Sequence, residues 1–278
     1  MPKRLSKGAV NKFRKEGYFF PVSLLDGFEV TEIKAHLETF EEAQGYPLEG
    51  RQRSHAHLLF PWLDSLVRHP IMLDVVEDLV GPNILCWGSI FWIKEARSDS
   101  FVSWHQDVTY WGLTGGDVVN AWVALSPANE TSGCMSVLPR SHLQPTLPHK
   151  DRYHHDNMLT RGQEIAVDVD LSKTVQMPLK PGEMSLHDIR IAHGSGPNSS
   201  GERRIGFSIQ YIPTCVRQTK SDLDYASLVR GEDNFGHFTL VPPPVQAMDA
   251  EAVTIHELAS EATSEILYKG AEKNTSRL

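Results

Sequence analysis

Hydrophobic residues in the first eighty positions recur every three to four residues, which is the spacing of an amphipathic helix. One group precedes Gly17, a residue type that commonly ends helices in the left-handed conformation. A second group falls in residues 30–40, and a third fills residues 70–80, which start with a proline and stop before Gly81. This pattern predicts N-terminal helices over about residues 8–80.

After Ile84 the pattern changes to short apolar, β-branched and aromatic runs separated by glycine and proline, and it continues to about Ile212. Many short strands with turn signals between them are typical of a sandwich or jelly roll. The sequence therefore predicts a mainly β fold, a double-stranded β-helix (jelly roll, cupin-like) with flanking α-helices. We expect the jelly-roll core over about residues 84–215 and a C-terminal extension over residues 216–278. Because β-sandwiches and barrels reach this size undivided, we expect residues 1–278 to form a single domain.

Two further segments depart from the strand pattern. Residues 143–164 show neither a helical nor a strand period, and they are too long for an ordinary connection. They are expected to form an active-site loop or lid. The tail contains a helical stretch near residues 250–268, and its polar end, residues 269–278, is expected to fray.

Composition and charge argue against several classes of function. The chain has 278 residues, 40% of them hydrophobic, with 27 lysines and arginines against 35 acidic residues and a formal net charge of −8. Such a mildly acidic chain without a basic stripe is not expected to bind nucleic acid. The charged N-terminus has no apolar stretch after it, and no apolar run is long enough to span a bilayer, so we expect a cytoplasmic protein that does not interact with membranes. The three cysteines are odd in number and far apart, which argues against a disulfide framework or a zinc cluster.

The strongest chemical signal is the triplet His105-Gln106-Asp107, which lies in a run of aromatic and β-branched residues that predicts a strand. Side chains two apart in a strand point to the same side, so His105 and Asp107 could hold one metal ion together. Two imidazoles and one carboxylate form the facial set that binds Fe(II) in oxygenases and leaves coordination positions open. A second histidine is therefore expected further along the chain.

Two downstream histidines, His187 and His193, could complete this set. Both share strand parity, and both precede glycine-rich sequence. If the segment between them were extended, it would span about 20 Å, so the two could not bind one iron. The residues alone leave the choice between them open.

Five short motifs carry a resemblance to a known family. They are W-H-Q-D at 104–107, W-V-A-L at 122–125, G-C-M-S-V-L-P-R-S-H at 133–142, P-G-E at 181–183 and H-G-S-G-P-N at 193–198, the last followed by two arginines. Through them the sequence resembles the phytanoyl-CoA dioxygenase family of non-haem iron, 2-oxoglutarate-dependent oxygenases, including its chlorinating-enzyme-like bacterial branch, over about residues 8–215. The resemblance implies Fe(II), 2-oxoglutarate and O2 as cofactor and co-substrates. It also implies the metal ligands His105, Asp107 and His193, which leaves His187 as a buried histidine near the site.

A 2-oxoglutarate co-substrate needs a cation for its far carboxylate, and arginine suits this because its guanidinium makes a bidentate pair. Arg203 and Arg204 both follow the distal histidine motif at about the distance that the family implies. Adjacent strand residues face opposite sides, and Arg204 lies on the more polar face, so we predict that Arg204 points inward and holds 2-oxoglutarate. The resemblance also implies contacts from Trp122 and Ser195. Asn120 joins this set because it shares a strand face with Trp122.

The resemblance implies that 2-oxoglutarate is decarboxylated to succinate and CO2 while O2 is consumed and a substrate C–H bond is hydroxylated. Desaturation or cyclisation with the same cofactors is an alternative. Chlorinating relatives carry a small residue in place of the iron-binding carboxylate, so Asp107 argues against halogenation. A different class also stays open: cupin-type metal-binding proteins without oxygen chemistry, which have no need of an inward arginine beside Trp122.

The sequence says least about the substrate. The aromatic residues that could form an apolar or cation-binding wall are Phe91, Trp92, Tyr110 and Trp111, and the cations that could hold an anionic group are Lys94, Arg97, Arg140 and Arg190. The histidines expected to be structural rather than substrate-binding are His55, His57, His154 and His155. The bacterial branch favours a small polar or zwitterionic metabolite, with a fatty acyl-CoA or a specialised metabolite as the alternative. The oligomeric state is left open.

Overall fold

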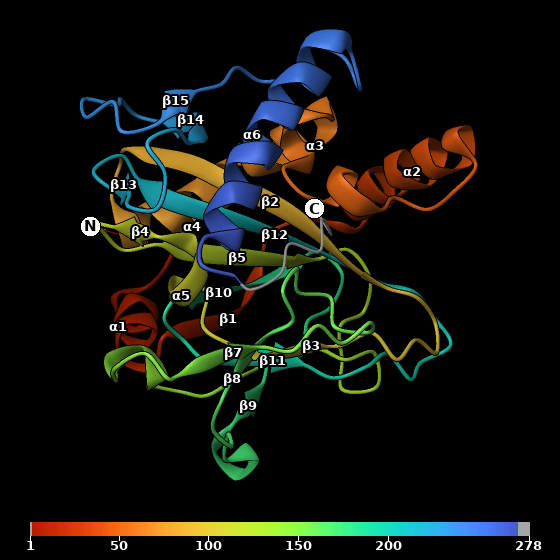
Figure 1. The fold of residues 1–278 in the computed structure, drawn as a ribbon. Helices are drawn as coiled ribbons and strands as arrows, with labels where there is room; N and C mark the ends of the chain where they lie inside the picture. Colours follow the sequence, from red (N-terminus) through yellow and green to blue (C-terminus); the bar gives the residue numbers. More distant parts are fainter. Residues whose placement is uncertain (1, 272–278) are drawn as a thin grey trace.

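A computed structural model describes residues 2–271 and shows two facing β-sheets with helices packed on the larger one (Figure 1). The α-helices are α1 (Lys7–Glu16), α2 (Gly27–Gln44), α3 (Pro61–Val67), α4 (Pro70–Val80), α5 (Val108–Trp111) and α6 (Ala250–Tyr268). The strands are β1 (Tyr18–Ser23), β2 (Ile84–Lys94), β3 (Val102–His105), β4 (Leu113–Thr114), β5 (Val119–Ala124), β6 (Met135–Val137), β7 (His149–Asp151), β8 (Gln163–Ile165), β9 (Val175–Gln176), β10 (Glu183–Asp188), β11 (His193–Ser195), β12 (Arg204–Pro213), β13 (Arg217–Gln218), β14 (Tyr225–Arg230) and β15 (Thr239–Leu240).

Local capping explains where the N-terminal helices begin and end. The Asp26 carboxylate accepts hydrogen bonds from the backbone N–H groups of Phe28 and Glu29, while the Glu29 side chain accepts one from the Asp26 N–H. This reciprocal box starts α2, because it satisfies donors that have no partner within the helix. α1 and α2 stop at Gly17 and Gly45, both in the left-handed conformation. The three predicted N-terminal helices are confirmed as α1, α2 and α4, whereas α3 is not predicted by the pattern.

The large sheet has the strand order β1-β10-β5-β12-β2-β14-β15 and is antiparallel except between β14 and β15. Alternate residues of its central strand β12 face opposite sides. Phe207 and Ile209 pack with the N-terminal helices into the main hydrophobic core, while Ser208 and Gln210 line a cavity on the other face. Burial of a large apolar side chain stabilises the fold by roughly 1.5–3 kcal/mol. The core therefore fixes which face of β12 points inward.

Close packing inside the jelly roll depends on a glycine at position 206. A Cβ atom there would lie 1.9 Å from Cζ2 of Trp122 on the neighbouring strand β5. Any side chain at Gly206 would therefore displace the indole ring. The glycine lets Trp122 lie flat against the inner face of the sheet.

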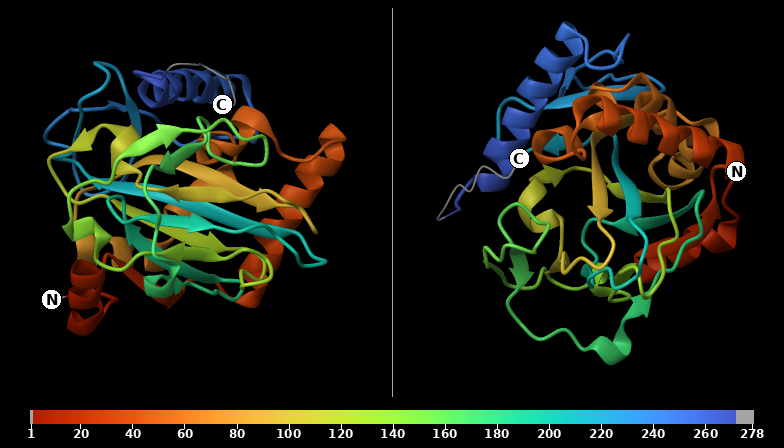
Figure 2. Two further views of the ribbon diagram at one scale, coloured as in Figure 1. Left: turned by 60° about the horizontal axis from the view of Figure 1, so that its bottom comes forward. Right: turned by 90° about the vertical axis from the view of Figure 1, so that its right-hand side faces the viewer.

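The small sheet, in the order β3-β11-β6-β9, faces the large one across the interior (Figure 2). Small and polar residues of the large sheet, such as Gly88 and Ser208, line the space between the two sheets. This architecture confirms the predicted mainly β, cupin-like jelly roll with flanking helices.

The large sheet also takes strands from outside the expected core of residues 84–215. β1 lies within the segment expected to be helical, and β14 and β15 lie in the C-terminal extension. β1 pairs with β10, which follows far along the chain. Local periodicity does not predict such pairing, because strand preference depends on the neighbours that a strand has in the folded protein. The organisation of residues 1–278 as a single domain stays a prediction.

Segment 143–164 is more regular than expected. Its strand β7 pairs with β8 in an antiparallel hairpin, and the Met158 N–H donates to the Phe101 carbonyl. The pattern did not predict this hairpin, because a three-residue strand is too short to show a period. The predicted C-terminal helix is confirmed as α6. Of the polar end, residues 272–278 lie outside the described residues.

Within residues 2–271, no helix is long and apolar enough to cross a membrane. The three cysteines are free thiols, and Cys86 and Cys134 are buried.

Candidate active site

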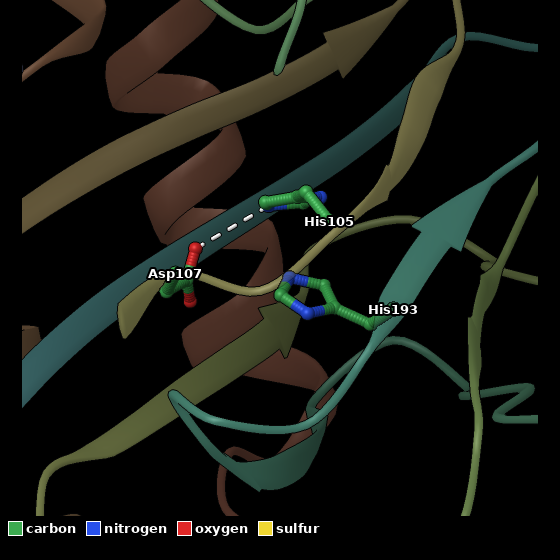
Figure 3. Close-up of side chains that lie close together, drawn as sticks. All are labelled: His105, Asp107 and His193. Carbon is green, nitrogen blue, oxygen red and sulfur yellow. Dashed lines mark ion pairs between the residues drawn. The ribbon is translucent and has the colours of Figure 1, made fainter. Parts of the chain in front are cut away.

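His105 and Asp107 meet although the chain between them is not extended. His105 is the last residue of β3, whereas Asp107 stands just before α5 with helical backbone angles, φ −56° and ψ −38°. The turn into α5 brings the carboxylate back, so that Asp107 Oδ1 lies 3.3 Å from His105 Nε2 (Figure 3). The predicted pair is present, but the expectation that one continuous strand holds both residues is wrong.

Strand pairing brings the third residue to them. His193 opens β11 and is the Cα partner of His105 in the antiparallel pair β3–β11, with their ring centroids 4.1 Å apart. Ligand atoms from His105, Asp107 and His193 all lie within 4.8 Å of one another. Figure 3 shows the three side chains converging on one space, and all three are buried.

Backbone carbonyls fix the tautomer of both imidazoles. His105 Nδ1 lies 2.9 Å from the Ser103 carbonyl oxygen, and His193 Nδ1 lies 3.0 Å from that of Ile191. A carbonyl oxygen only accepts, so each Nδ1 carries the proton and each Nε2 keeps its lone pair. Metal-binding histidines are commonly oriented in this way. His105 and His193 are therefore prepared to bind a cation through Nε2.

Burial and neighbouring groups favour the protonation state that a metal requires at His193 and Asp107. Burial, together with nearby His105, holds the pKa of His193 well below its usual range, which favours the neutral imidazole. Burial alone would raise the pKa of Asp107, but a proton on the neighbouring His193 or His105 attracts the carboxylate, and the net shift of that pKa is downward. Asp107 Oδ2 is buried without a hydrogen-bond partner among the described residues. A buried carboxylate oxygen in that state is unfavourable unless a cation binds it.

His187 lies beside this group of side chains. The chain turns between β10 and β11, so the rings of His187 and His193 are 4.7 Å apart and His187 Nε2 lies 4.0 Å from Asp107 Oδ2. The expected separation of about 20 Å is therefore wrong, because the intervening residues are not extended. Burial lowers the pKa of His187 to about 4. Neither of its ring nitrogens has a hydrogen-bond partner in the described part of the chain.

Arg204 points into the cavity and Arg203 points away from it, as strand alternation predicts. Arg203 forms an ion pair with Glu41 at 2.6 Å. Arg204 donates through Nη1 to the Gly133 carbonyl at 2.7 Å and lies over the Trp122 ring, 5.4 Å from its centroid. Burial lowers the pKa of Arg204 to about 10, and its Nε has no hydrogen-bond partner within residues 2–271. A buried guanidinium of this kind fits an anion.

Lys94 adds a second buried basic side chain beside Arg204. It is the Cα partner of Arg204 across β2 and β12. Its Nζ donates to Ser195 Oγ at 2.7 Å and also to the Gly196 carbonyl. Burial and nearby Arg204 lower the pKa of Lys94 to about 6. The sequence suggested Lys94 for an anionic group of the substrate, whereas the structure puts it beside the residues expected to hold 2-oxoglutarate.

The other members of that expected set also face the cavity. Asn120, Trp122, Ser195 and Arg204 all line it, although they come from three different strands. Asn120 Oδ1 is buried without a hydrogen-bond partner among the described residues. Their role in binding 2-oxoglutarate stays a prediction.

Aromatic side chains form much of the remaining cavity wall. Trp92, Tyr110 and Trp111 line it as expected, and Trp87 joins them. Phe91 does not, because it lies on the opposite face of β2 and packs into the main core. The expectation for Phe91 is therefore wrong, since residues adjacent in a strand point to opposite sides.

Three of the four cations suggested for an anionic substrate group lie away from the cavity. Arg140 forms an ion pair with Glu16, and Arg190 forms one with Asp188. Arg97 is exposed in the loop after β2. Residue type alone suggested these three positions, and none of the three side chains lines the cavity.

Two segments that the pattern does not connect with the site also line the cavity. Thr263 and Leu267 come from α6, and Ser54 and His55 come from the chain before β2. His55 Nε2 lies 2.8 Å from Thr263 Oγ1, so the two segments support each other. His55 thus faces the cavity although it was expected to be structural. An apolar helical face predicts that α6 is buried, but not which element it covers.

Segment 143–164 supplies part of the cavity wall. Its lining residues are Met158, Leu159, Thr160 and Gln163. Its histidines lie elsewhere: His149 Nε2 accepts from the Gln106 N–H at 3.0 Å, and His154 and His155 are exposed.

We expect segment 143–164 to act as a cover that becomes ordered when substrate binds. Its amides should exchange hydrogen quickly in the protein loaded with Fe(II) and 2-oxoglutarate, and more slowly once substrate is added. Hydrogen-exchange mass spectrometry measures this, with residues 118–125 as the rigid control. Equal protection of the two segments before substrate is added would show that 143–164 is structural packing.

Comparisons with known proteins agree with this geometry. The profile of the phytanoyl-CoA dioxygenase (PhyH) family matches residues 13–206. A probable alpha-ketoglutarate-dependent hypophosphite dioxygenase of Stutzerimonas stutzeri is 32% identical over 165 residues, which are 58% of this chain and 56% of that protein. An ectoine dioxygenase of Bordetella bronchiseptica is 26% identical over 221 residues, which are 70% of this chain and 71% of that protein.

A solved structure is similar over nearly the whole chain. ThoJ, a non-heme monooxygenase in its apo form, superposes with a TM-score of 0.83 at 34% identity, covering 94% of this chain and 98% of ThoJ. By contrast, the match to the hypophosphite dioxygenase spans little more than half of that relative's length, 56%.

Proposed function

This chain belongs to the phytanoyl-CoA dioxygenase family, and from that premise we propose that it is an Fe(II)- and 2-oxoglutarate-dependent dioxygenase. It would hydroxylate an unactivated C–H bond of a small polar or zwitterionic metabolite and release succinate and CO2. The observation that supports this most is the convergence of His105, Asp107 and His193 in a cavity that also holds buried Arg204. A cupin-type metal-binding protein would need the three metal ligands but not the buried arginine.

His105 Nε2, His193 Nε2 and an Asp107 oxygen would hold the iron. Two neutral imidazoles and one carboxylate suit Fe(II) with open positions, whereas a structural zinc site closes with four protein ligands. When bound, iron with 2-oxoglutarate and O2 supplies the oxidising power that protein side chains lack. Asp107 supports hydroxylation over halogenation, because its carboxylate takes the position that a halide would need.

Arg204 would pair with the far carboxylate of 2-oxoglutarate, with Ser195 and Lys94 beside it. An anion there would give Arg204 Nε a partner and would favour the charged form of Lys94 beside it. Trp122 covers the guanidinium and excludes water, which strengthens the ion pair. Asn120, the remaining member of the set expected to bind 2-oxoglutarate, offers its Oδ1 as a further polar atom.

The names of two relatives support a small polar substrate. One is named for hypophosphite and the other for ectoine, and they are 32% and 26% identical to this chain. We extend only the size and polarity of those molecules to this protein, because neither relative is close enough in sequence to transfer a substrate.

The oxygenase function can be tested by spectroscopy and product analysis. Anaerobic addition of 2-oxoglutarate to the Fe(II)-loaded protein should produce a weak visible charge-transfer band. A metabolite screen for substrate-dependent succinate release in air should then identify the substrate. Tight metal binding without the band would contradict the proposal and favour a metal-binding protein without oxygen chemistry.

Binding of 2-oxoglutarate should take up a proton and weaken as the pH rises. The pKa of Lys94 is lowered to about 6 in the free protein, so the amine is mostly neutral at neutral pH. A carboxylate beside it favours the charged form and raises that pKa, so the proton binds together with the anion. Calorimetry in buffers of different ionisation enthalpy measures the uptake.

The variant Lys94→Met is the control for this pH dependence. It should abolish both the proton uptake and the loss of affinity above a pH of about 6. If the unmodified protein takes up no proton, Lys94 does not contact the co-substrate.

A further inference from the structure

Polar residues in cross-strand register form a row across the inner face of the large sheet. His187 pairs with Asn120, Asn120 with Gln210, and Gln210 with Gly88. All four line the cavity. Asn120 Oδ1 and both ring nitrogens of His187 are buried without hydrogen-bond partners in the described structure. Buried polar atoms usually have partners, so this face has hydrogen-bonding capacity left for a ligand.

The row ends, away from the candidate metal ligands, at the part of the cavity wall that Gly88, Gln210 and His55 form, which we call the Gly88 notch. A Cβ at Gly88 would lie 2.9 Å from Gln210 Oε1 and 3.7 Å from His55 Nδ1. Gln210 Nε2 donates to Ser208 Oγ, and His55 Nε2 meets Thr263 Oγ1. These contacts turn Gln210 Oε1 and His55 Nδ1 toward the notch, where they can meet a ligand.

The backbone of His55 is a second, independent observation. His55 has a left-handed conformation with φ 50°, which is uncommon for a residue other than glycine, and it is only 4% exposed. Its N–H donates to the Ser89 carbonyl at 2.6 Å. Buried residues in such conformations concentrate at functional sites, because the surrounding structure must hold them there.

The surroundings of the notch favour an uncharged ligand group. Among the described residues that line the cavity, the only acidic or basic ones besides histidine are Asp107 and Arg204, which lie in the candidate iron and 2-oxoglutarate sites. Burial lowers the pKa of His55 to about 3, so its imidazole is neutral. Trp87 and Trp111, with ring centroids 5.2 Å apart, also line the cavity. A charged group would lose its hydration here without gaining a counter-charge.

We propose that the Gly88 notch binds an uncharged substrate group that carries an N–H or O–H donor, with a carboxamide as the best fit. The donor would form a hydrogen bond to Gln210 Oε1, and His55 Nδ1 would form one with the other polar atom of the group. The rest of the substrate would lie along Trp87 and Trp111 toward the iron ligands. This inference rests on the proposed function and narrows its substrate class, because it excludes a free carboxylate, phosphate or ammonium at this end.

Fragment binding tests the charge preference without any turnover. The probes are phenylacetamide, phenylacetate and phenethylamine, measured by ligand-observed NMR on protein loaded with Ni(II) and 2-oxoglutarate. Phenylacetamide should bind about tenfold more tightly than either charged probe, the equivalent of one or two hydrogen bonds. Equal or tighter binding of a charged probe, or no binding of phenylacetamide, would overturn the inference. A failed charge-transfer assay would instead count against the oxygenase function, so the two failures are distinguishable.

A side chain at position 88 tests the position of the binding site. Gly88 is not among the glycines with positive φ, so its backbone accepts alanine, and the new Cβ would lie 2.9 Å from Gln210 Oε1 and push that carboxamide out of place. Gly88→Ala should weaken phenylacetamide binding about tenfold. The matched control is Gly201→Ala, where a Cβ would have no heavy atom within 4 Å. If Gly88→Ala binds phenylacetamide as tightly as this control does, the notch is not the binding site.

Changing the charge of the notch gives a result that a damaged fold cannot imitate. Gln210→Glu keeps the shape of the side chain and supplies a carboxylate, so the preferred probe should change from phenylacetamide to phenethylamine. Gln210→Leu should weaken phenylacetamide without gaining phenethylamine. An unchanged order of the three probes in Gln210→Glu would show that they bind elsewhere.

Discussion

Alanine at His105, Asp107 or His193, one at a time, should abolish Fe(II)- and 2-oxoglutarate-dependent turnover. Each change removes one of only three protein donors whose ligand atoms converge within 4.8 Å. The loss should exceed the roughly 10- to 100-fold effect of removing a residue that only supports a metal ligand. The fold should persist, because the main hydrophobic core lies on the other face of the large sheet. Iron content, succinate release and thermal unfolding of the three variants measure these effects.

His187→Ala is the control, since His187 is equally buried and lies next to the same carboxylate. It should retain Fe(II), whereas His193→Ala should not. His193 has its Nδ1 proton fixed by the Ile191 carbonyl, while the ring nitrogens of His187 have no hydrogen-bond partner among the described residues. Iron binding that survives in His193→Ala and fails in His187→Ala would identify His187 as the distal ligand.

Arg204→Ala should raise the 2-oxoglutarate concentration needed for half-maximal turnover about tenfold or more. Loss of a charged hydrogen-bonding partner costs about 1.5–3 kcal/mol, which corresponds to that factor. Arg204→Lys should recover only part of the affinity, because an ammonium group lacks the planar fork that matches a carboxylate. Succinate release measured against 2-oxoglutarate concentration, at saturating Fe(II), gives these values.

The neighbouring Arg203→Ala is a matched control for the same assay. Arg203 has the same charge but points outward and pairs with Glu41 and Glu95. It should leave the 2-oxoglutarate requirement nearly unchanged. Equal effects of the two substitutions, or a larger effect at Arg203, would contradict the assignment from strand alternation.

Prediction of the fold succeeded where a segment is long enough to show its own period. The helices α1, α2, α4 and α6 carry apolar residues at helical spacing, and clear caps end α1 and α2. β1 and the hairpin β7–β8 are short, and their partners are chosen by the rest of the fold. A local pattern does not contain those partners.

Prediction of the site brought together the right side chains and partly failed for geometry. Residue types indicated two imidazoles and one carboxylate, the family resemblance added an inward arginine, and strand alternation separated Arg204 from Arg203. The geometric steps assumed extended chain through His105–Asp107 and through His187–His193. The chain leaves the extended conformation at Asp107, just before α5, and a turn interrupts the second segment.

The sequence by itself determined which donor groups this protein has and which face of a regular strand each occupies, because side-chain chemistry and the two-residue strand period are local properties. Only the tertiary structure decided what meets across the cavity. The pairing of β3 with β11 brings His193 to His105, β2 carries Lys94 to Arg204, and α6 covers His55. These contacts join segments far apart in the chain. They form because burying the apolar faces of helices and sheets fixes how the elements pack, and that depends on the whole sequence at once.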